Sequence, residues 1–133
     1  MKEFNLEIVT PDGVAFFGKA ISLITRTSDG DVEIMAGHID YIASLGTGRT
    51  RIKTAEGERF ASSSGGFLTV SGGEVKLVPI TFEFGEDIDL GRARLAKERA
   101  EEMLRNAKDR EAIDLAKAKL SRAISRISVA EAL

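Results

Sequence analysis

Apolar and polar positions alternate along the first part of the chain, and the pattern then changes to a longer period. Phe4, Leu6 and Ile8 alternate with polar residues, which is the period-two pattern of a half-buried strand. Residues 10–13 (Thr-Pro-Asp-Gly) are typical of a turn, because proline suits its first central position and glycine accepts a positive φ. The chain is therefore predicted to begin with a β-hairpin.

Short apolar runs separated by glycine-rich turns continue to about residue 84. The predicted strands after the first are residues 14–17, 21–27, 32–35, 41–45, 49–54, 59–63, 67–70 and 75–80. Turn signals at this spacing are typical of a β-sandwich or barrel. Gly65-Gly66 lacks the lysine and hydroxyl residue of a phosphate-binding loop and precedes a strand, so we interpret it as a bulge or a tight bend. An all-β domain is predicted over residues 1–85.

After Gly85 the apolar period changes to three and four residues, which indicates helices. Asp87 or Asp89 can cap the first helix. Its apolar positions are Ala93, Ala96, Ala100, Met103 or Leu104, and Ala107; those of the second helix are Ile113, Ala116, Leu120, Ile124 and Ile127. Only residues 106–110 can connect the helices, so an antiparallel hairpin is predicted over residues 86–133. The predicted fold class is α+β, a sandwich of about ten short strands followed by this hairpin.

The composition limits the chemistry that the chain can perform. It contains no cysteine and one histidine, which excludes disulfides, thiolate sites and histidine-rich metal ligation within one chain. A nucleophile, a base and oxyanion donors do not occur together, so we expect no catalytic site and a non-enzymatic role. The net charge of -2 does not favour nucleic acid. The chain shows neither an apolar run near the roughly 20 residues of a membrane span nor a signal peptide, so we expect no direct membrane insertion.

Four arginines of the predicted hairpin can meet if its helices are antiparallel. With the bend near Lys108, Arg92 lies almost level with Arg126, and Arg99 lies within about a turn of Arg122. Clustered guanidinium groups repel one another unless an anion such as a polyphosphate binds between them. The spacing alone favours the simpler interpretation, in which these are solvated helix faces that pair with nearby glutamates.

Five segments along the chain form a recognisable set of motifs. They are Val9–Gly13, Gly37-His38, Ser64–Leu68, Ile88–Ala93 and Arg122–Val129. Together, and in this order, they resemble the epsilon subunit of bacterial rotary (F-type) ATP synthases essentially from end to end. The chain departs from the usual pattern at Ala36, where proline is expected, and at Asp40, where an apolar residue or proline is common.

The resemblance implies a non-catalytic central-stalk subunit, peripheral to the cytoplasmic face of the bacterial cell membrane, that couples proton-driven rotation to ATP synthesis. The gamma subunit and the c-ring would bind the sandwich, and the extended hairpin would reach the alpha and beta subunits and inhibit ATP hydrolysis. The hairpin folded against the sandwich, its compact form, would bind ATP as a regulatory ligand. The resemblance does not specify whether Mg²⁺ accompanies the ATP. The family's ATP-contacting positions correspond to Glu83, Ile88, Asp89 and Ala93 near the adenosine, and to Arg92, Arg99, Arg122 and Arg126 at the phosphates.

Two other functions remain open on the residues alone. The chain could be a free-standing nucleotide sensor, or an adaptor whose sandwich and hairpin bind proteins without any ligand. Binding to a gamma subunit and titration with ATP distinguish these functions.

Overall fold

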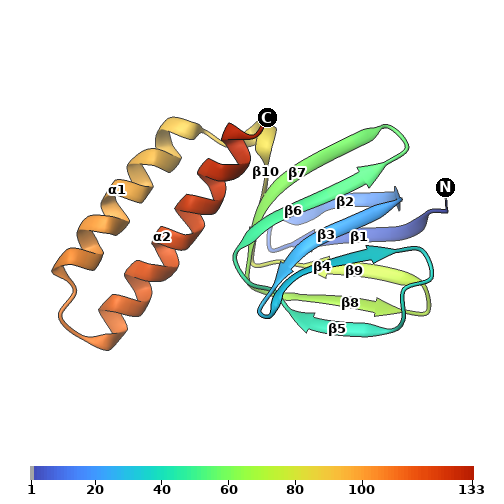
Figure 1. The fold of residues 1–133 in the computed structure, drawn as a ribbon, viewed down its shortest axis with the longest axis horizontal. Helices are drawn as coiled ribbons and strands as arrows, with labels where there is room; N and C mark the ends of the chain where they lie inside the picture. Colours follow the sequence, from blue (N-terminus) through green and yellow to red (C-terminus); the bar gives the residue numbers. More distant parts are fainter. Residues whose placement is uncertain (1) are drawn as a thin grey trace.

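The computed structural model describes residues 2–133, which form a β-sandwich followed by a two-helix hairpin (Figure 1). The strands are β1 (Phe4–Thr10), β2 (Gly13–Ala20), β3 (Ser22–Thr27), β4 (Gly30–Met35), β5 (Tyr41–Ser44), β6 (Gly48–Thr54), β7 (Gly57–Ser64), β8 (Phe67–Ser71), β9 (Glu74–Val78) and β10 (Thr81–Phe84). A short 3-10 turn, η1 (Gly85–Asp87), leads to the helices α1 (Leu90–Asn106) and α2 (Arg110–Glu131). The predicted α+β class is confirmed.

Two five-stranded sheets pack together around the core of the sandwich. Sheet A has the strand order β2-β1-β9-β8-β5, and sheet B has the order β10-β7-β6-β3-β4. The alternation in β1 is confirmed, since Phe4, Leu6 and Ile8 are all buried in the core cluster. β1 pairs with β9 in parallel, whereas the other paired strands are antiparallel. The first and last thirds of the sandwich sequence are thereby joined in one sheet.

The prediction of a single strand over residues 75–80 is wrong at its end. β9 stops at Val78 in sheet A, and β10 begins at Thr81 in sheet B. Pro79 lies between them, and it has no N–H to donate to a strand ladder, so the chain leaves sheet A at this point. β10 then pairs with β7, which sets Glu83 opposite Ser62 at the edge of sheet B.

The interpretation of Gly65-Gly66 as a tight bend is confirmed. Both residues have positive φ angles, +70° and +84°, and connect β7 to β8. A Cβ atom on Gly66 would lie 1.8 Å from the carbonyl oxygen of Val78. Only glycine therefore fits at this close approach of two backbone segments.

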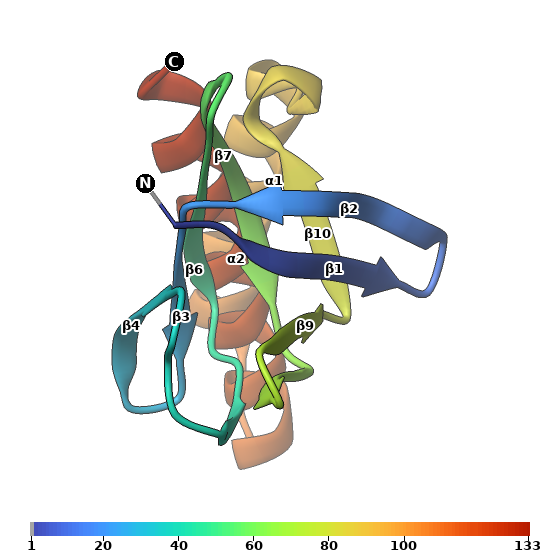
Figure 2. The ribbon, with the colours of Figure 1, turned by 90° about the vertical axis from the view of Figure 1, so that its right-hand side faces the viewer.

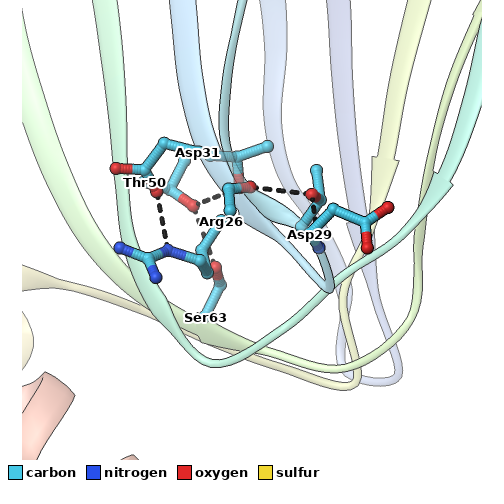
Figure 3. A network of polar contacts seen from close by, with 8 residues as sticks. Arg26, Asp29, Asp31, Thr50 and Ser63 are labelled. Carbon is cyan, nitrogen blue, oxygen red and sulfur yellow. Dashed lines mark hydrogen bonds and ion pairs between the residues drawn. The ribbon is translucent and has the colours of Figure 1, made fainter.

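A chain of buried hydroxyl groups crosses sheet B (Figure 3). The Oγ1 atoms of Thr25 and Thr50 are 2.8 Å apart, and Thr50 Oγ1 is 2.8 Å from Ser63 Oγ. These bonds link β3, β6 and β7 and satisfy hydroxyl groups that are almost fully buried. The same picture shows the ion pair between Arg26 and Asp31, with Nε to Oδ1 at 2.8 Å, which ties β3 to β4 near their turn.

Aspartates cap both helices. Of the two predicted caps, Asp89 is the N-cap of α1. Its Oδ1 accepts a hydrogen bond from the Arg92 N–H at 3.1 Å. Asp109 caps α2 by accepting from the Ala112 N–H at 2.8 Å. Of the predicted apolar positions, Ala93, Ala100 and Ala116 are buried, but the prediction of Ile124 is wrong, since it is 48% exposed and its neighbour Ala123 is buried instead. The two buried alanines of each helix are seven positions apart, which places them on one face of that helix.

The hairpin lies beside sheet B, with α2 between α1 and the sandwich (Figures 1 and 2). α2 packs on β7 and β6 and on η1, whereas α1 packs on α2. Helix α2 therefore carries most of the contact between the two parts. Within residues 2–133, neither helix is long and apolar enough to cross a membrane.

Candidate anion-binding cleft

A cleft of about 610 Å³ opens between the hairpin and the edge of sheet B. Five parts of the fold line it: β1 with its turn to β2, β7, the segment of β10, α1 and α2. Its lining residues are Thr10, Asp12, Ser62, Ser64, Ile80, Thr81, Phe82, Glu83, Ala96, Arg99, Ala100, Met103, Lys119, Arg122, Ala123 and Arg126. Both helices and the sandwich are needed to form it, so it exists only when the hairpin is folded against the sandwich.

Four cations from the two helices face this cleft. Lys119, Arg122 and Arg126 are three and four residues apart on α2, so they lie along one face, and Arg99 enters from α1. Among residues 2–133, only Arg126 of these four has a carboxylate within 4.0 Å. Three cations of the described chain therefore line the cleft with no carboxylate within 4.0 Å of them. Such an arrangement favours binding of an anion.

The fourth cation attaches α2 to the sandwich. Arg126 Nε donates to Glu83 Oε1 at 2.8 Å, and the neighbouring Ser125 Oγ lies 2.8 Å from Ser62 Oγ. Because Glu83 and Ser62 are opposite each other on β10 and β7, two adjacent residues of α2 bond to two adjacent positions of sheet B. The carboxylate also places one negative charge at this end of the cleft.

The structure brings together half of the eight predicted site residues. Glu83, Arg99, Arg122 and Arg126 line the cleft. The other four, Ile88, Asp89, Arg92 and Ala93, belong to the start of α1 and are outside the lining. There Asp89 caps the helix, Ala93 is fully buried, and Arg92 is exposed. Their role in binding a ligand stays a prediction.

The cleft residues that were not among the predicted site residues include Lys119, Thr10 and Asp12. Lys119 could have been found, because it precedes Arg122 by three residues and Arg126 by seven. Thr10 and Asp12 gave no such signal, since only the tertiary fold brings the β1–β2 turn to the hairpin. Met103, predicted as a core residue on equal terms with Leu104, is 37% exposed and lines the cleft.

The junction between sandwich and hairpin is held by one arginine. The guanidinium group of Arg59 lies 3.5 Å from the ring centroid of Phe84, and its Nη2 donates to Glu86 Oε1 at 2.5 Å. This hydrogen bond lowers the pKa of Glu86 below its usual value, helped by a backbone hydrogen bond. Arg59 thus fixes the 3-10 turn from which α1 begins.

Elsewhere, no three side chains of metal-binding type among residues 2–133 are grouped to hold an ion.

Comparison with known families decides what kind of protein contains this cleft. The profile of the beta-sandwich domain of the ATP synthase Delta/Epsilon chain matches residues 3–85, and that of its long alpha-helix domain matches residues 86–131. The chain belongs to this family. The resemblance to the epsilon subunit that the sequence motifs indicated is confirmed.

Whole-chain relatives agree with this assignment to the delta/epsilon family. The ATP synthase epsilon chains of Staphylococcus aureus strains JH9 and Newman are each 38% identical to the chain, covering 98% of it and 98% of their own length. The fold is similar to a chain in the Euglena gracilis mitochondrial ATP synthase (OSCP/F1/c-ring), with a TM-score of 0.82, 21% identity and coverage of 92% and 78%. A chain of the Tetrahymena thermophila mitochondrial ATP synthase central stalk and c-ring gives a TM-score of 0.68 at 12% identity, with 97% of both chains covered.

One apolar surface of this family member lies outside the cleft. Met35 at the end of β4, Ile39 in the connection to β5 and Ile42 in β5 are 49%, 76% and 74% exposed. The connection is ordered by local contacts, because Asp40 Oδ1 accepts a hydrogen bond from the Gly72 N–H at 3.1 Å. Asp40 thus joins this segment to the β8–β9 turn. We name Met35, Ile39 and Ile42 the apolar patch.

Proposed function

We propose that the chain is a non-catalytic central-stalk subunit of a rotary ATP synthase whose helical hairpin senses ATP. The observation that carries the sensing role is that Arg99, Lys119 and Arg122, which have no carboxylate within 4.0 Å among residues 2–133, line a cleft that both helices and the sandwich form. The family membership supports the role in the stalk.

ATP suits this cleft in charge and in the distribution of polar groups. Forked guanidinium groups bind phosphate oxygens through charge-assisted hydrogen bonds, which relieve the repulsion among the cations. The phosphates would contact Arg99, Arg122 and Arg126, whereas the predicted contact of Arg92 would require its exposed side chain to reach in from outside the cleft lining. The adenosine would lie towards Glu83 and the start of α1, where Ile88, Asp89 and Ala93 are located. Mg²⁺ would reach the site bound to the phosphates, since no carboxylate cluster offers it a site in the described chain.

A ligand held by both helices and the sandwich stabilises the compact hairpin by mass action. At 100 times its dissociation constant it contributes about 2.7 kcal/mol. Changing a population from 1:99 to 99:1 requires about 5.5 kcal/mol. ATP therefore biases the position of the hairpin, and contacts with neighbouring subunits supply the remainder. The extended hairpin would reach the alpha and beta subunits and inhibit hydrolysis.

The sandwich supplies a separate surface for the rotor. The apolar patch is distant in sequence from the cleft residues, and exposed isoleucines in one short segment are typical of a protein contact. The partners we propose are the gamma subunit and the c-ring, on the cytoplasmic face of the bacterial membrane. There the subunit takes part in coupling proton-driven rotation to ATP synthesis.

Calorimetric titration of the full chain with ATP tests the sensing role. Arg122→Ala is expected to weaken binding about tenfold, because it removes a charged hydrogen bond. Arg105→Ala is the matched control, since Arg105 is an exposed arginine of α1 outside the cleft lining. Unchanged affinity in Arg122→Ala, or no binding by the wild type, would contradict the proposal.

Gel filtration with a gamma subunit tests the stalk role. A stoichiometric complex that is weakened by Ile42→Lys is expected, because a charge in the apolar patch must be desolvated on binding. If no complex forms while ATP still binds, the chain is a free-standing sensor. If the complex forms without ATP binding, it is an adaptor.

A further inference from the structure

The cationic side of the cleft is not electrically uniform. Along α2, Arg126 is paired with Glu83 at 2.8 Å, whereas Arg122 and Lys119 have no ion-pair partner within 4.0 Å among residues 2–133. Seven residues of helix separate Arg126 from Lys119, a distance of roughly 10 Å along the axis. Among the α2 cations, the one beside Glu83 is therefore neutralised and the two nearer the start of the helix are not.

This difference along α2 favours one orientation of a bound nucleotide in the cleft. Arg94 of α1 pairs with Glu131 of α2 at 3.1 Å, so the start of α1 lies beside the end of α2, beyond Arg126. The nucleoside, which is uncharged, suits the neutralised end near Glu83 and the start of α1. The phosphate chain then extends towards Arg122 and Lys119, and its last group carries the most negative charge.

We propose that Lys119 is a specificity-determining residue that binds the terminal phosphate and favours nucleoside triphosphates over diphosphates. This inference rests on the proposed nucleotide binding in the cleft. Lys119 lines the cleft, is otherwise exposed and makes no ion pair in the described chain, so its flexible ammonium group is free to contact an anion. A diphosphate placed with the same nucleoside position ends one phosphate short of it. The lysine then contributes to binding of the longer ligand and little to binding of the shorter one.

One carboxylate opposes this attraction. Asp12 enters the cleft from the β1–β2 turn, and its side chain makes no ion pair within residues 2–133. Its charge repels a polyphosphate, although salt screens the effect in a partly open cleft. Lys119 and Asp12 should therefore change the affinity for ATP in opposite directions when they are neutralised.

Calorimetric titration of the full chain with ATP and with ADP tests the proposal. Lys119→Gln is expected to weaken ATP binding about tenfold and ADP binding by about twofold or less, as expected for the loss of one charged contact to the last phosphate. Lys117→Gln is the control, because Lys117 is an exposed lysine of the same helix outside the cleft lining. It should change neither affinity. Asp12→Asn should strengthen ATP binding about twofold at low salt.

The results separate this inference from the proposed function. If the wild type binds ATP and Lys119→Gln binds it equally well, or loses ATP and ADP affinity in equal measure, the role of Lys119 is refuted while the nucleotide site stands. Weaker ATP binding by Asp12→Asn would refute the electrostatic argument. No ATP binding by the wild type would overturn both proposals. Thermal unfolding of each variant by circular dichroism confirms that it is folded.

Discussion

Replacing Val129 with alanine should loosen the hairpin without loosening the sandwich. Val129 is fully buried at the end of α2 and packs on the 3-10 turn, where a Cβ on Gly85 would lie 3.1 Å from Val129 Cγ1. The substitution removes two methyl groups, each contributing about 0.8 kcal/mol when buried, so the docked hairpin loses about 1.6 kcal/mol. The cavity left behind adds to this loss to the extent that the site does not collapse.

Native-state hydrogen exchange measures this effect in each part of the fold. A loss of about 1.6 kcal/mol corresponds to roughly 15-fold faster exchange of α2 amides that open with the hairpin. Amides of β1 and β9, in sheet A, should exchange as in the wild type. Ile124→Ala is the control, because Ile124 lies on the same helix but is 48% exposed.

One outcome would refute the underlying reasoning. If α2 and the central strands of sheet A lose protection equally in Val129→Ala, the hairpin does not open as a separate unit. A switch that depends on undocking the hairpin would then require unfolding of the sandwich, which is incompatible with regulation.

Two further predictions concern the sandwich and the junction. Gly66→Ala should destabilise the protein by about 3 kcal/mol or more, since its Cβ would meet the Val78 carbonyl oxygen at 1.8 Å. The control Gly72→Ala has open space around it and should cost only about 1 kcal/mol for its positive φ. Equal melting temperatures of the two variants would contradict this prediction. Because the hydrogen bond from Arg59 lowers the pKa of Glu86 in the folded state, its charge stabilises the fold above the unfolded pKa, near 4.5, and this contribution is lost as the pH falls through the folded pKa. The stability difference between wild type and Glu86→Gln should therefore shrink on acidification, and a difference that grows would contradict the assignment.

Most of the fold could be predicted because its signals are local. Alternation in β1 and glycines at the turns specify strands and their ends, and the change of period after Gly85 specifies helices. The transfer of the chain to sheet B at Pro79 was missed because residues 75–80 read as one apolar run. Pro79 was a local signal for this break, because proline has no N–H for a strand ladder, whereas the pairing of the next strand with β7 is information that no single segment contains.

The candidate site was only partly predictable for the same reason. Arg122 and Arg126 share a helix, so their spacing was informative, and the antiparallel hairpin added Arg99. Arg92 was expected level with Arg126. In the structure α1 starts beside the end of α2, as the contact of Arg94 with Glu131 shows, and this register leaves Arg92 outside the cleft lining. The contribution of the β1–β2 turn depends on tertiary packing alone.

The docking contacts of α2 are weak enough for a ligand to control them. The bond between Ser62 and Ser125 is worth about 1 kcal/mol net. The ion pair of Arg126 with Glu83, whose side chains are 30% and 35% exposed, contributes on the order of 1 kcal/mol or less because solvent screens it. Together with burial of Val129, these contributions are a few kcal/mol, similar to the roughly 2.7 kcal/mol that the proposed ligand would supply at 100 times its dissociation constant. A leucine-rich docking face would exceed any such ligand effect, so the small and polar residues of α2 suit the proposed function, in which a ligand shifts the position of the hairpin.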